Sequence, residues 1–340
     1  MSRIILQPED VAAVRRLGRE VAAGIDSVED ETFLRDAPLW AHELPRALRR
    51  ELNEFKLREP ASGYCIVSGY TVDQAKIGPT PAHWKHKKGR SGALEEEVLL
   101  VLLGSLLGDC IGWATQQDGT VVHDILPIQG HQGEQLGSGS EQLLWWHTED
   151  AFHPYRGDYL GMMCLRNPDA VATTYASLEG LALAEEHLDL LFSPHYTIRP
   201  DESHLRKNRA NPAAAEGQLG ASYDQIERMS TRPEKIAVLH GDQRAPYIRI
   251  DPYFMDLVED NPPAQAALDA LIAFIESRLE ELAFEPGELC FIDNFKAVHG
   301  RQPFKARFDG TDRWLKRVNI ARDLRKSRTA RARADSRIIQ

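Results

Sequence analysis

The sequence predicts a mainly β fold with added helices, in which one β-sandwich or jelly-roll core is flanked by an N-terminal helical region and a helical insertion. Residues 1–110 are mainly helical in pattern, because apolar side chains recur there at intervals of three and four. From residue 111 to residue 320 the pattern changes to many short β-type runs separated by turn residues. Such a succession is typical of a layered β core that carries helices on its outside.

Four elements are expected in the first part. Apolar spacing predicts helices over 8–24 and 30–57, and Pro8 with acidic residues in the first turn favours the start of the first one. The nearly continuous apolar run at 94–107 predicts a helix that is buried all round. A β-rich run bounded by glycines predicts a strand over 63–69.

The second part is expected to hold the core strands and the inserted helices. Helices are predicted at 178–192 and 264–284. Two polar stretches, 129–141 and 204–223, are either surface loops or two lids over an active site. The strands are predicted at 120–122, 143–149, 159–165, 196–199, 236–240, 247–250, 288–293 and 315–320.

Composition argues against several classes of protein. The chain has 41 Lys plus Arg against 51 Asp plus Glu, and this net charge of −10 argues against a nucleic-acid-binding surface. No run of 18 apolar residues is present, so no membrane span is expected. The four cysteines lie far apart and lack CxxC spacing, which indicates reduced core residues of a cytoplasmic protein. The Arg-rich tail at 321–340 is interrupted by acids, and we expect it to be a solvated terminus.

The main chemical signal is a histidine followed two residues later by a glutamate. In a strand over 143–149, the period of two directs His147 and Glu149 to one face. A second buried strand, ending in a turn, is expected to deliver His299, with Gly300 allowing the backbone to come close. The two histidines and the glutamate would form a two-His-one-carboxylate set, which suits non-haem Fe(II). Alone, the pair is weak, since most of the twelve histidines are expected to be structural or solvated.

Two arginines strengthen the metal hypothesis. Arg313, Leu315 and Arg317 alternate along the last predicted strand and therefore share one face. An arginine that points inward is costly unless it meets an anion. Arg313 could bind the distal carboxylate of 2-oxoglutarate, whose keto-acid end chelates iron, and Arg317 could bind a second carboxylate in the same cavity. A surface position on an edge strand is the common alternative for any single arginine.

These motifs, in this order, resemble those of the clavaminate synthase-like Fe(II)/2-oxoglutarate dioxygenases. More narrowly, they resemble the arginine hydroxylases of the viomycin and streptothricin pathways. The resemblance covers nearly the whole chain. It is carried by the runs His147–Arg156, Leu165–Asp169, Ile198–His204, Phe291–Asn294, Ala297–Arg301 and Asp312–Arg317, and by Ala41–Pro45 and Trp113–Gly119 in the N-terminal part.

The resemblance implies a double-stranded β-helix (jelly-roll) core within a single domain over 1–340, with the core at 111–320. It implies oxidative decarboxylation of 2-oxoglutarate to succinate and CO2 by O2, coupled to hydroxylation of an unactivated C–H bond of a free amino acid. The two histidines and Glu149 resemble the iron ligands of the family, and Arg313 resembles its 2-oxoglutarate clamp. Thr173 or Thr174 matches a threonine that hydrogen-bonds the cosubstrate.

The resemblance also implies the residues that bind the substrate. Glu149 and Gln116 resemble groups that hold its α-amine, and Arg317 resembles the one that holds its α-carboxylate. Asp201 resembles an acid on a lid, and Asp251 resembles an acid that pairs with a guanidinium. An unpaired buried cation is strongly unfavourable, so a guanidino substrate requires such acids. Either aspartate could instead be a simple turn residue beside a proline.

Two departures from the viomycin-type pattern leave the substrate open. Tyr253 stands where a second guanidinium-binding acid is expected, and Gly137 replaces a serine. Tyr253 could stack on a planar guanidinium or shape the pocket for a cyclised one. One substrate is L-arginine, hydroxylated at Cβ with or without a second hydroxylation at C4. The other is L-enduracididine, hydroxylated at Cβ.

Two alternatives belong to other classes of protein. A zinc hydrolase also uses histidines and a carboxylate with an open water site, but it has no need for inward arginines. A jelly-roll binding module without redox chemistry would not need a metal set beside an anion clamp. We expect a free guanidino amino acid as the partner, with no nucleic acid and no membrane, and the sequence does not indicate an oligomeric state.

Overall fold

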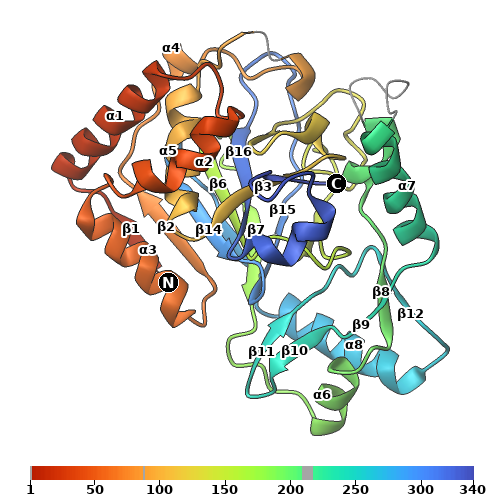
Figure 1. The fold of residues 1–340 in the computed structure, drawn as a ribbon. Coiled ribbons are helices and arrows are strands. Elements are labelled where there is room, and N and C mark those ends of the chain that lie inside the picture. Colours follow the sequence, from red (N-terminus) through yellow and green to blue (C-terminus); the bar gives the residue numbers. More distant parts are fainter. Residues whose placement is uncertain (1, 87–88, 209–216) are drawn as a thin grey trace.

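Two β-sheets packed face to face form the centre of the molecule, and helices cover both outer sides (Figure 1). The computed structural model describes residues 2–86, 89–208 and 217–340. Across the larger sheet the strands are β1 (Ser2–Ile5), β2 (Tyr64–Ser68), β14 (Leu289–Asp293), β6 (Tyr159–Arg166), β16 (Trp314–Ala321), β3 (Asp109–Trp113) and β17 (Ile338–Ile339), with β4 (His123–Ile125) beside β16. Across the smaller sheet they are β13 (Glu280–Leu282), β7 (Thr173–Ser177), β15 (Ala297–Arg301) and β5 (Leu144–His147).

Alternate side chains fill the space between the two sheets. In β6, Leu160 and Met162 pack with Tyr175 of the smaller sheet, whereas Met163 and Leu165 pack with the N-terminal helices. Both faces of β6 are therefore apolar, which explains why its sequence is a continuous apolar run. The prediction of a strand here is confirmed.

The N-terminal helices cover the outer face of the larger sheet (Figure 1). They are α1 (Pro8–Ala23), α2 (Glu31–Ala41), α3 (Arg46–Arg58), α4 (Gln74–Ile77) and α5 (Leu94–Ser105). Helix α5 contacts β3, β6 and β16, and α1 and α2 pack on α5, so α5 is buried all round as predicted. The expected helix over 30–57 is two helices, because the chain turns at 42–45 before Pro45, which has no amide hydrogen to continue a helix.

A buried ion cluster joins α5 to the strand that carries the two predicted arginines. Lys316 of β16 is 1% exposed and forms ion pairs with Glu97 of α5, at 2.6 Å, and with Asp124 of β4. Burial alone would lower the pKa of Lys316, but the two carboxylates outweigh it and raise that pKa. Trp314, Val318 and Ile320 of β16 pack in the same apolar cluster as the N-terminal helices. Leu315 points the other way and packs with Tyr175 of the smaller sheet.

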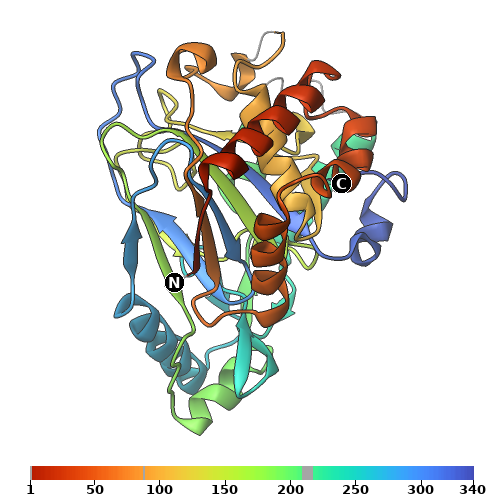
Figure 2. The same ribbon diagram turned by 90° about the vertical axis from the view of Figure 1, so that its left-hand side faces the viewer.

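The helical insertion covers the outer face of the smaller sheet, at the opposite end of the molecule from the N-terminal helices (Figures 1 and 2). Helices α6 and α8 pack on each other, and α8 also contacts β7. The insertion contains α6 (Glu185–Leu191), β8 (Tyr196–Ile198), α7 (Gly217–Thr231), β9 (Lys235–Ile236), β10 (Leu239–Asp242), β11 (Ala245–Ile248), β12 (Met255–Leu257) and α8 (Pro262–Glu276). Part of the polar stretch predicted at 204–223 lies outside the described residues.

Several other predicted elements also differ from the structure, among them two helices and a strand. The helix expected at 264–284 ends at Glu276, and residues 280–282 instead form β13, because pairing with β7 overrides the helical pattern. The helix expected at 178–192 is confined to α6. The strand expected at 120–122 is displaced to β4, which pairs with β16.

The prediction of a solvated C-terminal tail is wrong for much of 321–340. Strand β17 pairs in parallel with β3, and Ile339 is 1% exposed. Arg331 is also buried, and its guanidinium donates to the carbonyls of Leu324, Ala334 and Ser336. Backbone carbonyls rather than acids thus satisfy this arginine. Across the described part of the chain, no helix combines the length and apolar character needed to cross a membrane.

Candidate active site

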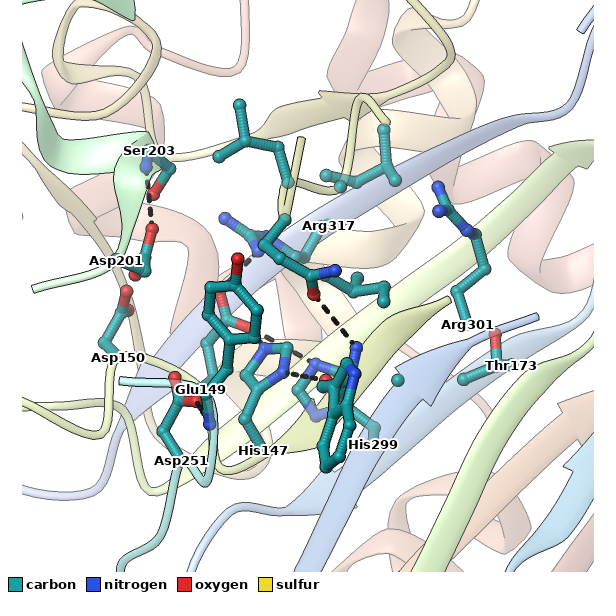
Figure 3. A pocket seen from close by; sticks show the side chains of 18 of the residues that line it. His147, Glu149, Asp150, Thr173, Asp201, Ser203, Asp251, His299, Arg301 and Arg317 are labelled. Carbon is teal, nitrogen blue, oxygen red and sulfur yellow. Dashed lines mark hydrogen bonds and ion pairs between the residues drawn. The ribbon is translucent and has the colours of Figure 1, made fainter. Parts of the chain in front are cut away.

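One end of the space between the sheets remains open as a pocket of about 840 Å³ including its mouth (Figure 3). Strands β5, β7 and β15 of the smaller sheet and β16 of the larger one line it. The predicted site residues that line this pocket are His147, Glu149, Thr173, Asp201, Asp251, Tyr253, His299, Arg313 and Arg317. Of the remaining two, Gln116 lines an adjoining hollow and Thr174 faces away from the pocket.

The two histidines and the glutamate of the predicted metal site converge. His147 and His299 are paired across β5 and β15, and their ring centroids are 4.7 Å apart. The Oε2 atom of Glu149 lies 3.8 Å from Nε2 of His147 and 3.2 Å from Nε2 of His299. One ligand atom from each residue lies within 4.8 Å of the other two. Neighbouring ligands of an octahedral metal, each at about 2.1 Å from it, lie about 3 Å apart, so the three atoms fit one metal ion.

The local structure that delivers these side chains differs from the prediction in two details. Strand β5 ends at His147, so Glu149 reaches the site from the turn that follows and not from the strand itself. His299 lies in the middle of β15 and not in a turn after a strand. Gly300 does allow a close approach as predicted, because a Cβ atom there would lie 2.5 Å from the carbonyl oxygen of Leu144.

Neighbouring groups fix the orientation of the three side chains. Nδ1 of His147 lies 2.8 Å from the carbonyl oxygen of Trp145, which leaves Nε2 facing Glu149. The buried Asn294 side chain accepts a hydrogen bond from the Glu149 amide at 2.7 Å and donates one to the Glu149 carbonyl at 3.0 Å. Oε2 of Glu149 is buried, and no donor among the described residues makes a proper hydrogen bond to it. A buried carboxylate oxygen without a donor, facing two imidazole nitrogens, fits a bound metal ion.

The charges of His147, Glu149 and His299, called the metal corner below, depend on one another. Burial would raise the pKa of Glu149, but Arg317 and then the two histidines hold it well below its usual value. Burial would lower the pKa of His147, but Glu149 and Asp251 outweigh it and raise that pKa to about 9. For His299, burial prevails and lowers the pKa. A metal ion that binds here must therefore displace a proton from His147.

One side of the pocket is cationic. Arg313 is 6% exposed, donates to Oγ1 of Thr173 at 3.3 Å and has no ion-pair partner among the described residues. Burial lowers its pKa to about 10. Strand alternation directs Thr173 into the pocket beside Arg313, whereas Thr174 points to the opposite face of β7. A buried, unpaired guanidinium is the expected binding group for a carboxylate.

Arg301 is paired with Thr173 across β15 and β7 and lies on the same side of the pocket (Figure 3). Its guanidinium donates to the carbonyl of Gly139 and, at 2.9 Å, to the carbonyl of Gln142. The polar stretch at 129–141, predicted as a surface loop or a lid, is thereby fastened to β15. Its residues Gln135 to Gly137 form part of the pocket wall.

The opposite side of the pocket is acidic. Asp150, Asp201 and Asp251 lie to one side of the metal corner, away from Arg301 and Thr173 (Figure 3). Burial raises the pKa of Asp251 to about 6, even though its Oδ1 accepts hydrogen bonds from two backbone amides at 3.1 and 3.3 Å. A buried carboxylate that lines a pocket suits a cationic group.

The remaining predicted residues frame the space between the two sides. Arg317 shares the pocket with Arg313, as predicted, and forms an ion pair with Oε1 of Glu149. The Gln116 amide donates to Ser203 at 2.6 Å and to Asp150 at 3.3 Å. Tyr253 stands at the mouth of the pocket and is 51% exposed.

The sequence pattern did not predict the buried hydrogen-bond network that lies behind the acidic side of the pocket. Asp150 accepts hydrogen bonds from Trp113 at 2.6 Å and from Asn319 at 2.8 Å, and its Oδ1 lies 3.1 Å from Nε2 of His204. Nδ1 of His204 lies 2.7 Å from Oγ1 of Thr115, and the His204 side chain is fully buried. The only available signal was the adjacency of Asp150 to Glu149, which does not reveal that this carboxylate turns away from the metal corner.

Comparisons with known proteins agree with the geometry. Residues 100–319 match the family described as taurine catabolism dioxygenase TauD, TfdA family. The chain is 46% identical to an enduracididine beta-hydroxylase of Streptomyces hygroscopicus over 342 residues, and 44% identical to an L-ornithine/L-arginine 3-hydroxylase of Catenulispora acidiphila over 343 residues. Both matches cover 100% of both chains.

A solved structure is equally similar. The crystal structure of the non-haem iron oxygenase OrfP in complex with Fe, succinate and (3S)-hydroxy-L-Arg matches with a TM-score of 0.95 and 46% identity, and the match covers 100% of both chains. The structure has a mixed α/β fold of the same type as this oxygenase. The resemblance expected from the ordered motifs is confirmed, and the protein belongs to the TauD/TfdA family of dioxygenases.

Proposed function

We propose that the protein is an Fe(II)/2-oxoglutarate-dependent hydroxylase that acts on Cβ of free L-arginine. One observation carries this proposal: a set of three metal-ligand side chains lies between a buried arginine that has no ion-pair partner among the described residues and a cluster of three acids. The arrangement suits an anionic cosubstrate on one side of the metal and a cationic substrate on the other. The relatives that hydroxylate arginine and enduracididine support the same class of substrate.

The metal and the cosubstrate are assigned to the smaller sheet and β16. His147, Glu149 and His299 hold Fe(II), which supplies the activation of O2 with 2-oxoglutarate that converts a C–H bond to an alcohol. Arg313 binds the distal carboxylate of 2-oxoglutarate through a charge-assisted hydrogen-bond pair, and Thr173 adds a hydroxyl to the same carboxylate. The complex of OrfP with Fe and succinate supports this pairing of metal and cosubstrate, because succinate is the product of 2-oxoglutarate decarboxylation.

The substrate is assigned to the acidic side. Arg317 holds the α-carboxylate, while Glu149 and Gln116 receive the α-amine. Asp251 pairs with the guanidinium, and Asp201 lies at the same side of the pocket. Each end of the amino acid thus meets a group of opposite charge, and the carbon chain between them crosses the metal corner.

We further infer that the two facing sheets are the halves of a double-stranded β-helix (jelly roll), within one oxygenase domain over 1–340. The inward-facing side chains of both sheets support this architecture, and so does the continuous apolar cluster that joins the N-terminal helices to the larger sheet. All four cysteines are buried, and none of them forms a disulfide within the described part of the chain, which supports a reducing, cytoplasmic setting.

L-enduracididine is the second candidate substrate. It is favoured by the 46% identity to an enduracididine beta-hydroxylase and by Tyr253, whose ring at the mouth of the pocket can stack on a cyclic guanidine. A zinc hydrolase and a binding module without redox chemistry leave the buried Arg313 without a ligand. A second hydroxylation at C4 is the remaining variant of the arginine hypothesis.

One experiment separates these functions. The full chain is loaded with Fe(II) without oxygen, then given O2, 2-oxoglutarate and, separately, L-arginine, L-enduracididine, L-ornithine and L-citrulline. We expect succinate in equal amount to a product that has gained one oxygen atom, with L-arginine preferred over its neutral isostere L-citrulline. Two-dimensional NMR of the product locates the hydroxyl at C3 or at C3 and C4. Succinate at the background level with every guanidino amino acid would reject the proposed substrate class.

A further inference from the structure

Thr148 lies between the predicted metal ligands His147 and Glu149 and is hydrogen-bonded to the residue before Asp251, the predicted substrate acid. Thr148 is fully buried, and its hydroxyl donates to the carbonyl of Ile250 at 3.1 Å and accepts from the Ile250 amide at 3.1 Å. The Thr148 amide also donates to the same carbonyl at 2.9 Å. The backbone polar groups of Ile250 are thus satisfied by one residue, and that residue lies between His147 and Glu149.

The carboxylate of Asp251 is held by further hydrogen bonds next to these contacts. Ile250 immediately precedes Asp251, and Oδ1 of Asp251 accepts hydrogen bonds from the amides of Tyr253 and Phe254. These two bonds fix how the carboxylate is turned, and the Thr148 bonds fix where its backbone lies. The acid therefore has little freedom to move relative to the metal corner.

Asn294 provides a contrast in the same corner. Its side chain holds the backbone of Glu149 and also donates to the carbonyl of Gly157. Within the described residues, that side chain makes no hydrogen bond to the segment that carries Asp251. Asn294 therefore acts on a metal ligand alone. Thr148 is placed to act on the relation between the metal ligands and the substrate acid.

We propose that Thr148 is a positioning residue that sets the distance between the metal and the guanidinium-binding carboxylate of Asp251, and thereby selects the carbon that is hydroxylated. This inference rests on the proposed function. A guanidinium held at a fixed distance from the metal brings one carbon of the chain closest to it. A change of about 1 Å in such positioning is enough to alter the outcome of a reaction. The hydroxyl of Thr148 is therefore a determinant of selectivity although it does not line the pocket.

The substitution Thr148→Val tests the inference, because valine keeps the branched shape and removes only the hydroxyl. The Ile250 amide then loses its acceptor, and the segment after β11 that carries Asp251 is free to shift. The measurement is L-arginine binding to the full chain loaded with Fe(II) and 2-oxoglutarate without oxygen, followed by calorimetry and by the visible charge-transfer band. We expect L-arginine affinity to fall about tenfold and L-citrulline affinity to stay within about twofold, since only the charged side chain uses Asp251. With oxygen, the share of product hydroxylated at C4 is expected to rise.

A double-mutant cycle makes the test specific. In an Asp251→Asn background, Thr148→Val is expected to have almost no further effect on L-arginine affinity, because the two residues act through one interaction. As a first control, Thr148→Ser retains the hydroxyl and is expected to give the wild-type product ratio. As a second control, Asn294→Ala removes the contacts with the Glu149 backbone and is expected to weaken Fe(II) binding instead. Equal loss of arginine and citrulline affinity, additive effects in the cycle, or loss of Fe(II) in Thr148→Val would overturn the role of Thr148. Absence of L-arginine binding in the wild-type chain would instead reject the proposed function, and with it the basis for this role.

Discussion

The metal corner, formed by His147, Glu149 and His299, faces residues 201–208 across the same pocket, but the two regions are held by different forces. Residues 201–208 carry Asp201, the acid predicted to lie on a lid, and are called the lid segment below for that reason. In the corner, the backbone ladder between β5 and β15 sets the two histidines opposite each other. The lid segment consists of two short 3₁₀ turns, η3 (Glu202–His204) and η4 (Arg206–Asn208), and it belongs to no sheet. Three side-chain hydrogen bonds fasten it: Gln116 donates to Ser203, and the two ring nitrogens of His204 bond to Thr115 and to the carboxylate of Asp150.

The difference matches what each region must do. Metal ligands have to keep a fixed geometry through every cycle, and a paired strand opens only at a large cost in free energy. A segment held by a few side chains opens at a lower cost, and the pocket must open for an amino acid to enter. Substitutions in the corner should therefore abolish the reaction with every substrate, whereas substitutions under the lid segment should affect the amino acid selectively.

The largest effect is expected in the corner. His147→Ala removes one of the metal ligands, and we expect Fe(II) binding to fall below detection and succinate formation to drop at least about 1,000-fold. Metal content and the charge-transfer band of the Fe(II)–2-oxoglutarate complex measure this directly. His42→Ala, which changes an exposed histidine far from the pocket in sequence, serves as the control. Full iron occupancy in His147→Ala would refute the assigned ligand set.

A smaller effect is expected on the cationic side. Arg313→Met keeps the length of the side chain but removes the charge, so 2-oxoglutarate loses its ionic partner while the metal ligands remain. We expect KM for 2-oxoglutarate to rise about 100-fold, which corresponds to the loss of a charge-assisted hydrogen-bond pair of about 3 kcal/mol. KM for L-arginine at saturating 2-oxoglutarate should change little. Equal increases in both KM values would show that Arg313 supports the pocket as a whole.

The lid segment should respond differently. His204→Phe keeps a ring against Trp113 and Phe152 but breaks the contacts with Thr115 and Asp150. We expect KM for L-arginine to rise about 30-fold, since buried groups left without partners cost about 2 kcal/mol, while Fe(II) and 2-oxoglutarate binding persist. His204→Gln, which can still donate a hydrogen bond, should recover part of the loss. If His204→Phe lost iron as readily as the corner variant, the two regions would not be independent.

The same contrast explains how much could be predicted from the sequence. Strand periodicity was sufficient to place Leu315 and Arg317 on the pocket face of β16, because alternation along a strand is a local rule. Glu149 also lines the pocket, but it does so from the turn after β5 and not through strand alternation. The contact of His204 with Asp150 joins residues 54 positions apart through side chains alone, and no local rule predicts it. In two other places, pairing between strands prevailed over the local sequence pattern. Strand β13 pairs with β7 although its segment has helical spacing, and β17 of the basic tail pairs with β3.

The smallest effect concerns Asp251, whose pKa burial raises to about 6. Below pH 6 this carboxyl is mainly neutral and cannot pair with a guanidinium, so KM for L-arginine should rise by up to about tenfold between pH 7 and pH 5. Affinity for L-citrulline should be flat over this range, and Asp251→Asn should remove the pH dependence for arginine. The iron content must be followed at each pH, because protons compete with the metal ion for His147. A wild-type profile with the same slope for arginine and citrulline would exclude Asp251 as the charged partner.

Because burial raises the pKa of Asp251, ionisation of this carboxyl is also expected to lower the stability of the folded protein. An acid whose pKa is higher in the folded chain than in the unfolded one contributes stability that is fully present below its unfolded value and is lost as pH rises through about 6. The ionised form that binds arginine is therefore the form that destabilises the free protein. Asp251→Asn should accordingly raise the melting temperature of the substrate-free protein at pH 7.5, while it weakens arginine binding. The guanidinium of L-arginine supplies a positive charge opposite the ionised Asp251 carboxylate, so L-arginine should restore the lost stability when it binds. Asp251 would thus be a preformed binding group for a cation.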